Sequence, residues 1–260
     1  MPAAPSLPSL VPQGQPVYDL DLMRELRGRR LCQELKVLAV IGAHRFDELP
    51  LVNKLFPSLE AIYVFEPLSE PLQALHALAA RDGRIRVFPV AIADRDGEAH
   101  FHVTNNDGES SSLLSLGSHR EHFPEVRVAQ TLTVPTRRLD SLLAENGLRA
   151  PDVMIVDVQG AELQVLGALG PALRDTLRLI YTEVSLEALY AGGGLLADVE
   201  ALLAPRFANL GFAPINAQVA AHGNAVFVAQ EDVSSLLELT AREQVRRAYH
   251  RWKQRRRRGG

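Results

Sequence analysis

The sequence contains a single cysteine, Cys32, and no apolar run long enough to cross a bilayer. One cysteine cannot form an internal disulfide, and it argues against a cysteine-based zinc site. The apolar run Val37–Ala43 is far shorter than the roughly 20 residues of a transmembrane helix. The first 16 residues lack a basic start and carry five prolines, which would break the apolar stretch of a signal peptide. We therefore expect a soluble, cytoplasmic protein.

The charges are unevenly distributed along the chain. Residues 242–260 contain nine basic side chains and one acidic side chain, a net charge of +8, whereas the whole chain carries −3 and the rest therefore −11. A basic tail on an acidic body can dock on that body, on anionic lipid or on nucleic acid. The acidic body, and a tail whose only aromatic residues are Tyr249 and Trp252, argue against nucleic acid as a partner. The tail is then either a solvated helix or a means of attaching the protein to an anionic membrane surface.

The chain of 260 residues, 47% of them hydrophobic, suffices for one α/β domain with a full core and short extensions. Residues 1–17 are rich in proline and serine and are predicted to form a flexible arm. Residues 18–230 are predicted to form the domain, and residues 231–260 a helical, basic tail. Four apolar side chains are expected to pack the start of the tail against the domain: Leu236, Leu237, Leu239 and Val245.

Apolar runs alternate with helical patterns along the domain. The runs predict strands at residues 36–41, 61–65, 85–91, 152–158 and 177–184. Helices are predicted at residues 18–35, 49–56, 71–80, 161–169 and 195–209. This alternation predicts a doubly wound α/β fold with a mostly parallel sheet.

Two further pairs of β-rich segments break the alternation. Residues 97–103 and 130–134 are expected to add antiparallel strands between the third and fourth parallel strands. Residues 212–215 and 224–229 flank a glycine-containing loop, which predicts a C-terminal antiparallel hairpin. A parallel sheet closed by such a hairpin is typical of class I methyltransferases and not of dinucleotide dehydrogenases.

Ligands of an open parallel sheet bind at the carboxyl ends of the strands. The first predicted strand leads into Gly42, which lets a ligand approach the backbone closely, although any strand-to-helix turn can use a glycine. Glu66 ends the second strand ahead of Pro67, where a carboxylate can accept bonds from two ribose hydroxyls or simply face solvent. Ala91 can form part of an apolar wall for an adenine ring or pack within the sheet.

Two more acids lie at predicted strand ends, Asp157 after the fourth strand and Glu183 in the fifth. With Glu66 they would place three carboxylates on one rim, which is unfavourable unless they bind hydroxyl groups, a cation or a proton. Glu162 falls in the first turn of a predicted helix, where its charge suits the helix dipole. The polar segment 105–112 is a candidate lid over the same cleft. The sequence indicates no metal site.

Several motifs occur together at these positions: FEP at 65–67, AIADRDG at 91–97, SSSL at 110–113, RRLDSLL at 137–143, DVQGAE at 157–162 and EVSLEALY at 183–190. Over residues 36–230 the sequence resembles the FkbM family of S-adenosylmethionine (SAM)-dependent methyltransferases. The resemblance implies transfer of a methyl group from SAM to a hydroxyl of a glycan or small natural product. It implies that Asp157 and Glu183 face the acceptor, and that SAM is bound by Gly42, Ala43, His44, Glu66, Pro67 and Ala91.

The sequence departs from the family pattern near the predicted SAM turn. Val40 replaces an acid that the family carries two residues before the glycine, and Phe46 replaces a second glycine. Two interpretations follow: an O-methyltransferase, or a methyltransferase fold that has lost transfer and acts as a non-catalytic binding or scaffold protein. His44 and His222 could each act as a base, but the sequence shows no partner for either.

Overall fold

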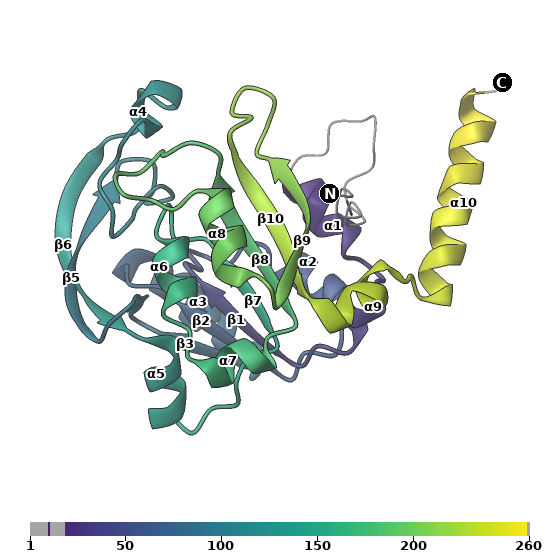
Figure 1. Cartoon of the computed structure of the whole chain (residues 1–260), viewed down its shortest axis with the longest axis horizontal. Coiled ribbons are helices and arrows are strands. Elements are labelled where there is room, and N and C mark those ends of the chain that lie inside the picture. Colours follow the sequence, from purple (N-terminus) through teal and green to yellow (C-terminus); the bar gives the residue numbers. More distant parts are fainter. Residues whose placement is uncertain (1–9, 11–18, 259–260) are drawn as a thin grey trace, which may run out of the picture.

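The computed structural model describes Leu10 and residues 19–258, and its centre is a seven-stranded sheet (Figure 1). The strand order is β3 (Ile85–Phe88), β2 (Ala61–Phe65), β1 (Val37–Ile41), β7 (Val153–Val156), β8 (Leu179–Ser185), β10 (His222–Ala229) and β9 (Phe207–Pro214). Neighbouring strands are parallel from β3 to β8, and β10 is antiparallel to both β8 and β9. The predicted doubly wound, mostly parallel sheet with a C-terminal hairpin is therefore confirmed.

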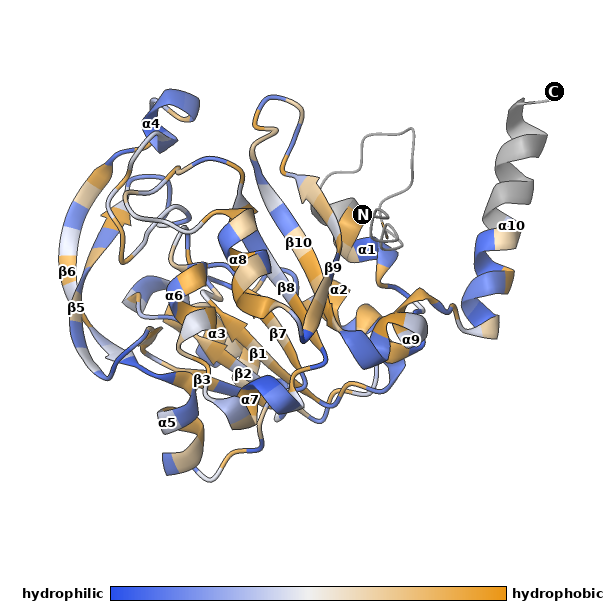
Figure 2. Cartoon of the chain, viewed as in Figure 1, coloured by the Kyte–Doolittle hydropathy of each residue, from blue (hydrophilic) through white to orange (hydrophobic). Residues whose placement is uncertain are grey.

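Alternate residues of β1 enter two different hydrophobic cores, one on each face of the sheet. Leu38 and Val40 belong to the first core, and Ala39 and Ile41 to the second. Side chains of a strand alternate between its two faces, so the continuous apolar run of β1 is what a strand covered on both faces requires. Figure 2 shows these central strands coloured as hydrophobic.

Helices supply the other half of each core. The first core includes side chains of α1 (Asp19–Glu25), α2 (Leu49–Leu55) and α3 (Ser69–Ala79). The second includes side chains of α5 (Leu139–Glu145), α6 (Glu162–Gly167), α7 (Pro171–Thr176) and α8 (Leu196–Leu203). The sheet is therefore a middle layer with helices packed on both of its faces, and these two layers position the loops at the carboxyl ends of its strands.

The third predicted strand, residues 85–91, is wrong in its extent. The chain leaves the main sheet at Pro89, where the Val90 N–H donates to the Phe88 carbonyl oxygen in a tight turn. The next residues form β4 (Ala91–Ile92) in a separate three-stranded sheet with β6 (Val128–Arg137) and β5 (Gly97–Thr104). The antiparallel pairing of the two added segments is confirmed, but they extend this second sheet and not the main one.

Two predicted helices are too long. The helix predicted over residues 18–35 ends as α1 at Glu25, ahead of Gly28, whose φ of +70° is a left-handed conformation that favours glycine. The helix predicted over residues 195–209 ends as α8 at Leu203, because Pro205 cannot continue it. The chain then enters β9, so the hairpin is longer than predicted.

The C-terminal residues form α9 (Val233–Leu237) and α10 (Ala241–Arg258), and α10 projects from the body of the protein (Figure 1). Leu236 is fully buried, as expected, but Val245 is 70% exposed, so its predicted packing on the domain is wrong. The predicted arm, residues 1–17, lies outside the described residues except for Leu10, whose N–H donates to the Leu210 carbonyl oxygen. In the described part of the chain, no helix has the length and apolar character needed to span a bilayer.

Candidate active site

The carboxyl ends of the central parallel strands open into one cavity of about 680 Å³. This volume lies within the usual range for small-molecule sites, about 300–1,000 Å³. All eight residues proposed from the sequence line it: Gly42, Ala43, His44, Glu66, Pro67, Ala91, Asp157 and Glu183. The fold therefore brings together residues from separate segments of the chain.

The turn after β1 can be made only with glycine at its first position. Gly42 has a φ of +79°, and a Cβ atom there would lie 1.7 Å from the carbonyl oxygen of Asp157. Phe46, which stands where the family pattern has a second glycine, has a φ of +55°. This left-handed conformation is uncommon for a bulky residue. The buried ring of Phe46 is part of the first core, so packing holds the turn in a shape that glycine would adopt freely.

Glu66 lines the cavity and also fixes the turn after β1. Its Oε2 accepts the backbone N–H of His44 at 2.9 Å, and its Oε1 accepts that of Leu68 at 2.8 Å. The side chain is only 5% exposed, and this burial raises the pKa of the carboxyl despite the two N–H donors. A carboxylate oxygen can accept more than one hydrogen bond, so Glu66 keeps capacity for ligand hydroxyls.

The segment predicted as a lid, residues 105–112, contributes to the wall of the cavity. Arg45 donates to Oδ2 of Asp107 at 2.7 Å and to Oε1 of Glu70 at 2.6 Å. Nε2 of His44 lies 3.0 Å from the carbonyl oxygen of Asp107. The segment is therefore bound directly to the turn that was proposed from the sequence to contact the ligand.

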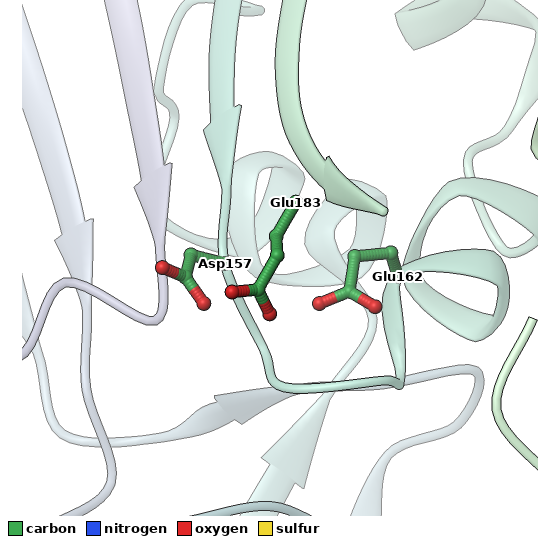
Figure 3. A group of neighbouring side chains, drawn as sticks. All are labelled: Asp157, Glu162 and Glu183. Carbon is green, nitrogen blue, oxygen red and sulfur yellow. The ribbon is translucent and has the colours of Figure 1, made fainter. Parts of the chain in front are cut away.

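Three carboxylates come together beyond β1, and Figure 3 shows their side chains converging; Asp157 and Glu183 line the cavity, and Glu162 is buried beside them. One oxygen from each of Asp157, Glu162 and Glu183 lies within 4.8 Å of the others. Glu162 begins α6, as predicted, but its Oε1 also turns back to accept the N–H groups of Val158 at 2.9 Å and Gly160 at 3.2 Å. Burial raises the pKa of Glu162 to about 7, and the nearby Asp157 charge acts in the same direction.

Hydrogen-bond donors lie between and beside these acids. Nε2 of Gln159 donates to Oδ1 of Asp157 at 2.8 Å and to Oε2 of Glu183 at 2.8 Å. Nε2 of His222 lies 2.9 Å from Oε1 of Glu183, and Nδ1 of His222 lies 2.8 Å from Oγ of Ser185. Glu183 is therefore held at both of its oxygens, whereas the Asp157 side chain is exposed in the cavity.

The His222 partners could not be found in the sequence, where that histidine has no evident pair. They arise from the antiparallel register of β10 and β8, which places His222 opposite Ser185 and two positions from Glu183 on the same face. A second histidine that was not singled out, His119 of α4 (His119–His122), also lines the cavity. Its ring packs against Phe123, and burial lowers its pKa.

Comparisons with known proteins agree with this architecture. Residues 41–214 match the family model of the methyltransferase FkbM domain. The sequence is 41% identical over 162 residues to 2-O-methyltransferase NoeI of Sinorhizobium fredii (strain NBRC 101917 / NGR234), covering 60% of this chain and 66% of that protein. The chain thus spans just under two thirds of the length of NoeI.

Solved structures also match the chain at low sequence identity. Methyltransferase FkbM from Methylobacillus flagellatus KT has a TM-score of 0.49 and 14% identity, over 75% of this chain and 44% of that one. Aeropyrum pernix fibrillarin, solved with bound SAM, has a TM-score of 0.44 and 10% identity, over 76% of this chain and 68% of that one. Because the family model matches most of the sequence, including the turn after β1 and the acids of the cavity, the chain belongs to the FkbM methyltransferase family.

Proposed function

We propose that this protein transfers a methyl group from SAM to a hydroxyl oxygen of a glycan or small natural product. The observation that carries the proposal is the shared cavity, into which the Gly42 turn, Glu66 and the Asp157–Glu183 pair all open. Membership of the FkbM family supports methyl transfer. The name of NoeI, a 2-O-methyltransferase, supports oxygen as the acceptor atom.

The residues on the β1 and β2 side of the cavity suit SAM. Gly42 lines the cavity and, lacking a side chain, lets the turn pack directly on the Asp157 backbone, and Glu66 can accept the two ribose hydroxyls. Ala91 lies beside Ile92 and Phe101 in the cavity wall and provides an apolar surface for the adenine ring.

Val40 provides no carboxylate for the SAM amino group, but two acids of the following turn, Asp47 and Glu48, also line the cavity. Either can neutralise an ammonium group from a position a few residues further along the chain. The departure at Val40 is thus compatible with SAM binding. Val40 and Phe46 remain the features that favour the non-catalytic interpretation, whereas Glu66, Asp157 and Glu183 favour the enzyme.

SAM, when bound, supplies an activated methyl group on a sulfonium, so the protein must orient the acceptor oxygen and remove its proton. Asp157 is the exposed carboxylate of the pair and receives that proton. Glu183, 4% exposed and bound by Gln159 and His222, keeps the wall behind Asp157 rigid. The segment 105–112 excludes water from the same space.

Calorimetric titration with SAM and with S-adenosylhomocysteine tests the proposal. Glu66→Ala should weaken binding at least tenfold, because each charge-assisted bond to a hydroxyl contributes roughly 1.5–3 kcal/mol. Glu60→Ala is the matched control, since Glu60 is exposed and pairs with Lys36 and Arg149 away from the cavity. Equal affinities for the Glu66 variant and the wild type would remove Glu66 from the site.

The same titration separates the two interpretations of the family pattern. A non-catalytic scaffold that has lost its cofactor gives no heat with either compound. Transfer itself is tested by incubating the protein with methyl-labelled SAM and a panel of hydroxylated oligosaccharides, and by following label in the acceptor fraction. Label that appears in the acceptor only when the protein is present and Asp157 is intact supports O-methyl transfer.

A further inference from the structure

Gln159 has an unusual conformation at the centre of the carboxylate group. Its φ is +55°, in the left-handed region that side-chain-bearing residues rarely adopt, and Gly160 follows with a φ of +96°. A Cβ atom on Gly160 would lie 2.7 Å from the side chain of Tyr190. Such backbone strain persists only where the surroundings enforce it, and it is concentrated at functional sites.

The orientation of the Gln159 amide is set by three hydrogen bonds. The nitrogen donates to Asp157 and to Glu183, each at 2.8 Å, and the oxygen accepts the Tyr190 hydroxyl at 2.6 Å. An amide turned by 180° would direct its oxygen at two carboxylates, which only accept when ionised, and would lose both bonds to them. The two N–H groups of Gln159 are therefore committed to the two acids.

The acids need such compensation because they lie close together. Two carboxylates that share a site repel each other, and they usually bind a cation or share a proton. The charged and titratable groups around Gln159 are Asp157, Glu162, Glu183, His222 and Tyr190. Among them, the Gln159 amide nitrogen lies between the two acids and donates a hydrogen bond to each of Asp157 and Glu183.

We propose that the Gln159 amide takes the place of a cation between Asp157 and Glu183 and is a positioning residue that fixes the two carboxylates side by side. The further statement that Asp157 and Glu183 face an acceptor hydroxyl rests on the proposed function. The charge compensation itself does not, since it follows from contacts within the chain.

The Gln159→Glu variant tests the proposal, because it keeps the shape of the side chain and replaces the donor by a third acid. At pH 7.5 its melting temperature should fall several degrees below that of the wild type. Lowering the pH to 5 should bring the two together, since the introduced carboxyl group, once protonated, again donates a hydrogen bond. Adding Mn²⁺ at pH 7.5 should restore the melting temperature of the variant and leave that of the wild type unchanged.

Gln164→Glu is the matched control, because Gln164 is an exposed residue of α6 outside the cavity. The effects of Mn²⁺ and of pH on its melting temperature should be the same as in the wild type. A Gln159→Met variant, similar in length but without a donor, is measured beside Gln159→Glu in case the latter does not fold. It should be less stable than the wild type at pH 7.5 and approach it at pH 5, where the two acids share a proton.

Two results would overturn the proposal. One is a Gln159→Met or Gln159→Glu protein as stable as the wild type at pH 7.5. The other is a wild-type protein that Mn²⁺ stabilises as much as it stabilises Gln159→Glu, because the acids would then bind a cation in spite of the amide. None of these measurements uses SAM, so the two proposals are tested independently. A negative result for Gln159 does not contradict the proposed function, and a lack of SAM binding does not contradict the role of Gln159.

Discussion

Gly42 and Asp157 approach each other so closely that a Cβ atom on Gly42 would lie 1.7 Å from the Asp157 carbonyl oxygen. The Asp157 N–H also donates to the carbonyl oxygen of Ile41 at 2.9 Å, so the ends of β1 and β7 are joined at this point. The turn proposed to bind SAM and the acid proposed to take the acceptor proton therefore share one rigid piece of backbone. A change at Gly42 must move both.

Gly42→Ala is accordingly expected to unfold the protein at lower urea concentration and to abolish SAM binding. The added methyl group meets backbone atoms that cannot move without separating two central strands, and we expect a loss of more than about 3 kcal/mol. Gly147→Ala is the control, since Gly147 also has a positive φ, +59°, but has no atom within 4 Å of the added Cβ. That variant should lose about 1–2 kcal/mol from the left-handed conformation alone and keep its SAM affinity.

The buried carboxyl of Glu162 predicts a specific dependence of stability on pH. Its pKa is raised to about 7 in the folded protein, mainly by burial. A raised pKa favours the protonated form, so its contribution to stability is complete below about pH 4.5 and is lost as the pH rises through about 7.

Glu162→Gln removes this titration while keeping an oxygen that can accept the N–H groups of Val158 and Gly160. We expect the variant to match the wild type at pH 5 in urea denaturation and to exceed it at pH 8, by an amount on the order of 2 kcal/mol. Glu121→Gln, on the exposed surface of α4, serves as the control. A difference between Glu162→Gln and the wild type that stays constant from pH 5 to pH 8 would contradict the assignment.

Val40 offers a test of the missing acid in the SAM turn. It is 4% exposed, lies in register between Val64 and Ile155, and lines the cavity. A carboxylate here would be buried among apolar neighbours, so Val40→Asp should lower the melting temperature without ligand. The SAM ammonium group can pair with that carboxylate, so SAM should raise the melting temperature of Val40→Asp more than that of the wild type. Val40→Asn should show no such gain, and equal SAM-induced shifts in all three proteins would refute the pairing.

The sequence predicted the order of elements because each central strand is a short, mainly apolar run between helical patterns, as in Val37–Ile41. It also predicted which strand ends would meet, since Gly42, Glu66, Asp157 and Glu183 all lie in one cavity. In a parallel sheet the carboxyl ends share an edge, so the residues there follow from the strand assignment.

What the sequence could not predict depends on register and on backbone angles. His222 is paired with Glu183 only because β10 lies antiparallel to β8 with one particular offset. Gln159 reaches both acids from a left-handed φ, and the sequence DVQGAE does not require that conformation of a glutamine. The predicted ends of helices and strands were wrong where a proline or glycine ends the element, as at Pro89 and Gly28.

The basic tail supplies the last prediction. Arginines near the start of α10 pair with acidic side chains of the described structure. Arg246 donates to Glu243 at 2.7 Å, and Arg247 donates to Glu25 of α1 at 2.9 Å. Cutting the chain after Ala248 keeps these contacts and removes six basic residues: Arg251, Lys253, Arg255, Arg256, Arg257 and Arg258.

These six residues follow the part of α10 that contacts the body, and each basic residue near an anionic membrane contributes about 1 kcal/mol of attraction. The attraction fades within a Debye length, about 8 Å at physiological salt. We therefore expect the full chain to sediment with anionic vesicles at low salt and the shortened chain to stay in the supernatant, with neither form binding neutral vesicles. SAM affinity should be equal in both forms. A shortened chain that sediments as well as the full chain would show that the tail is not the membrane attachment, and a loss of SAM affinity would show that the tail contributes to the site.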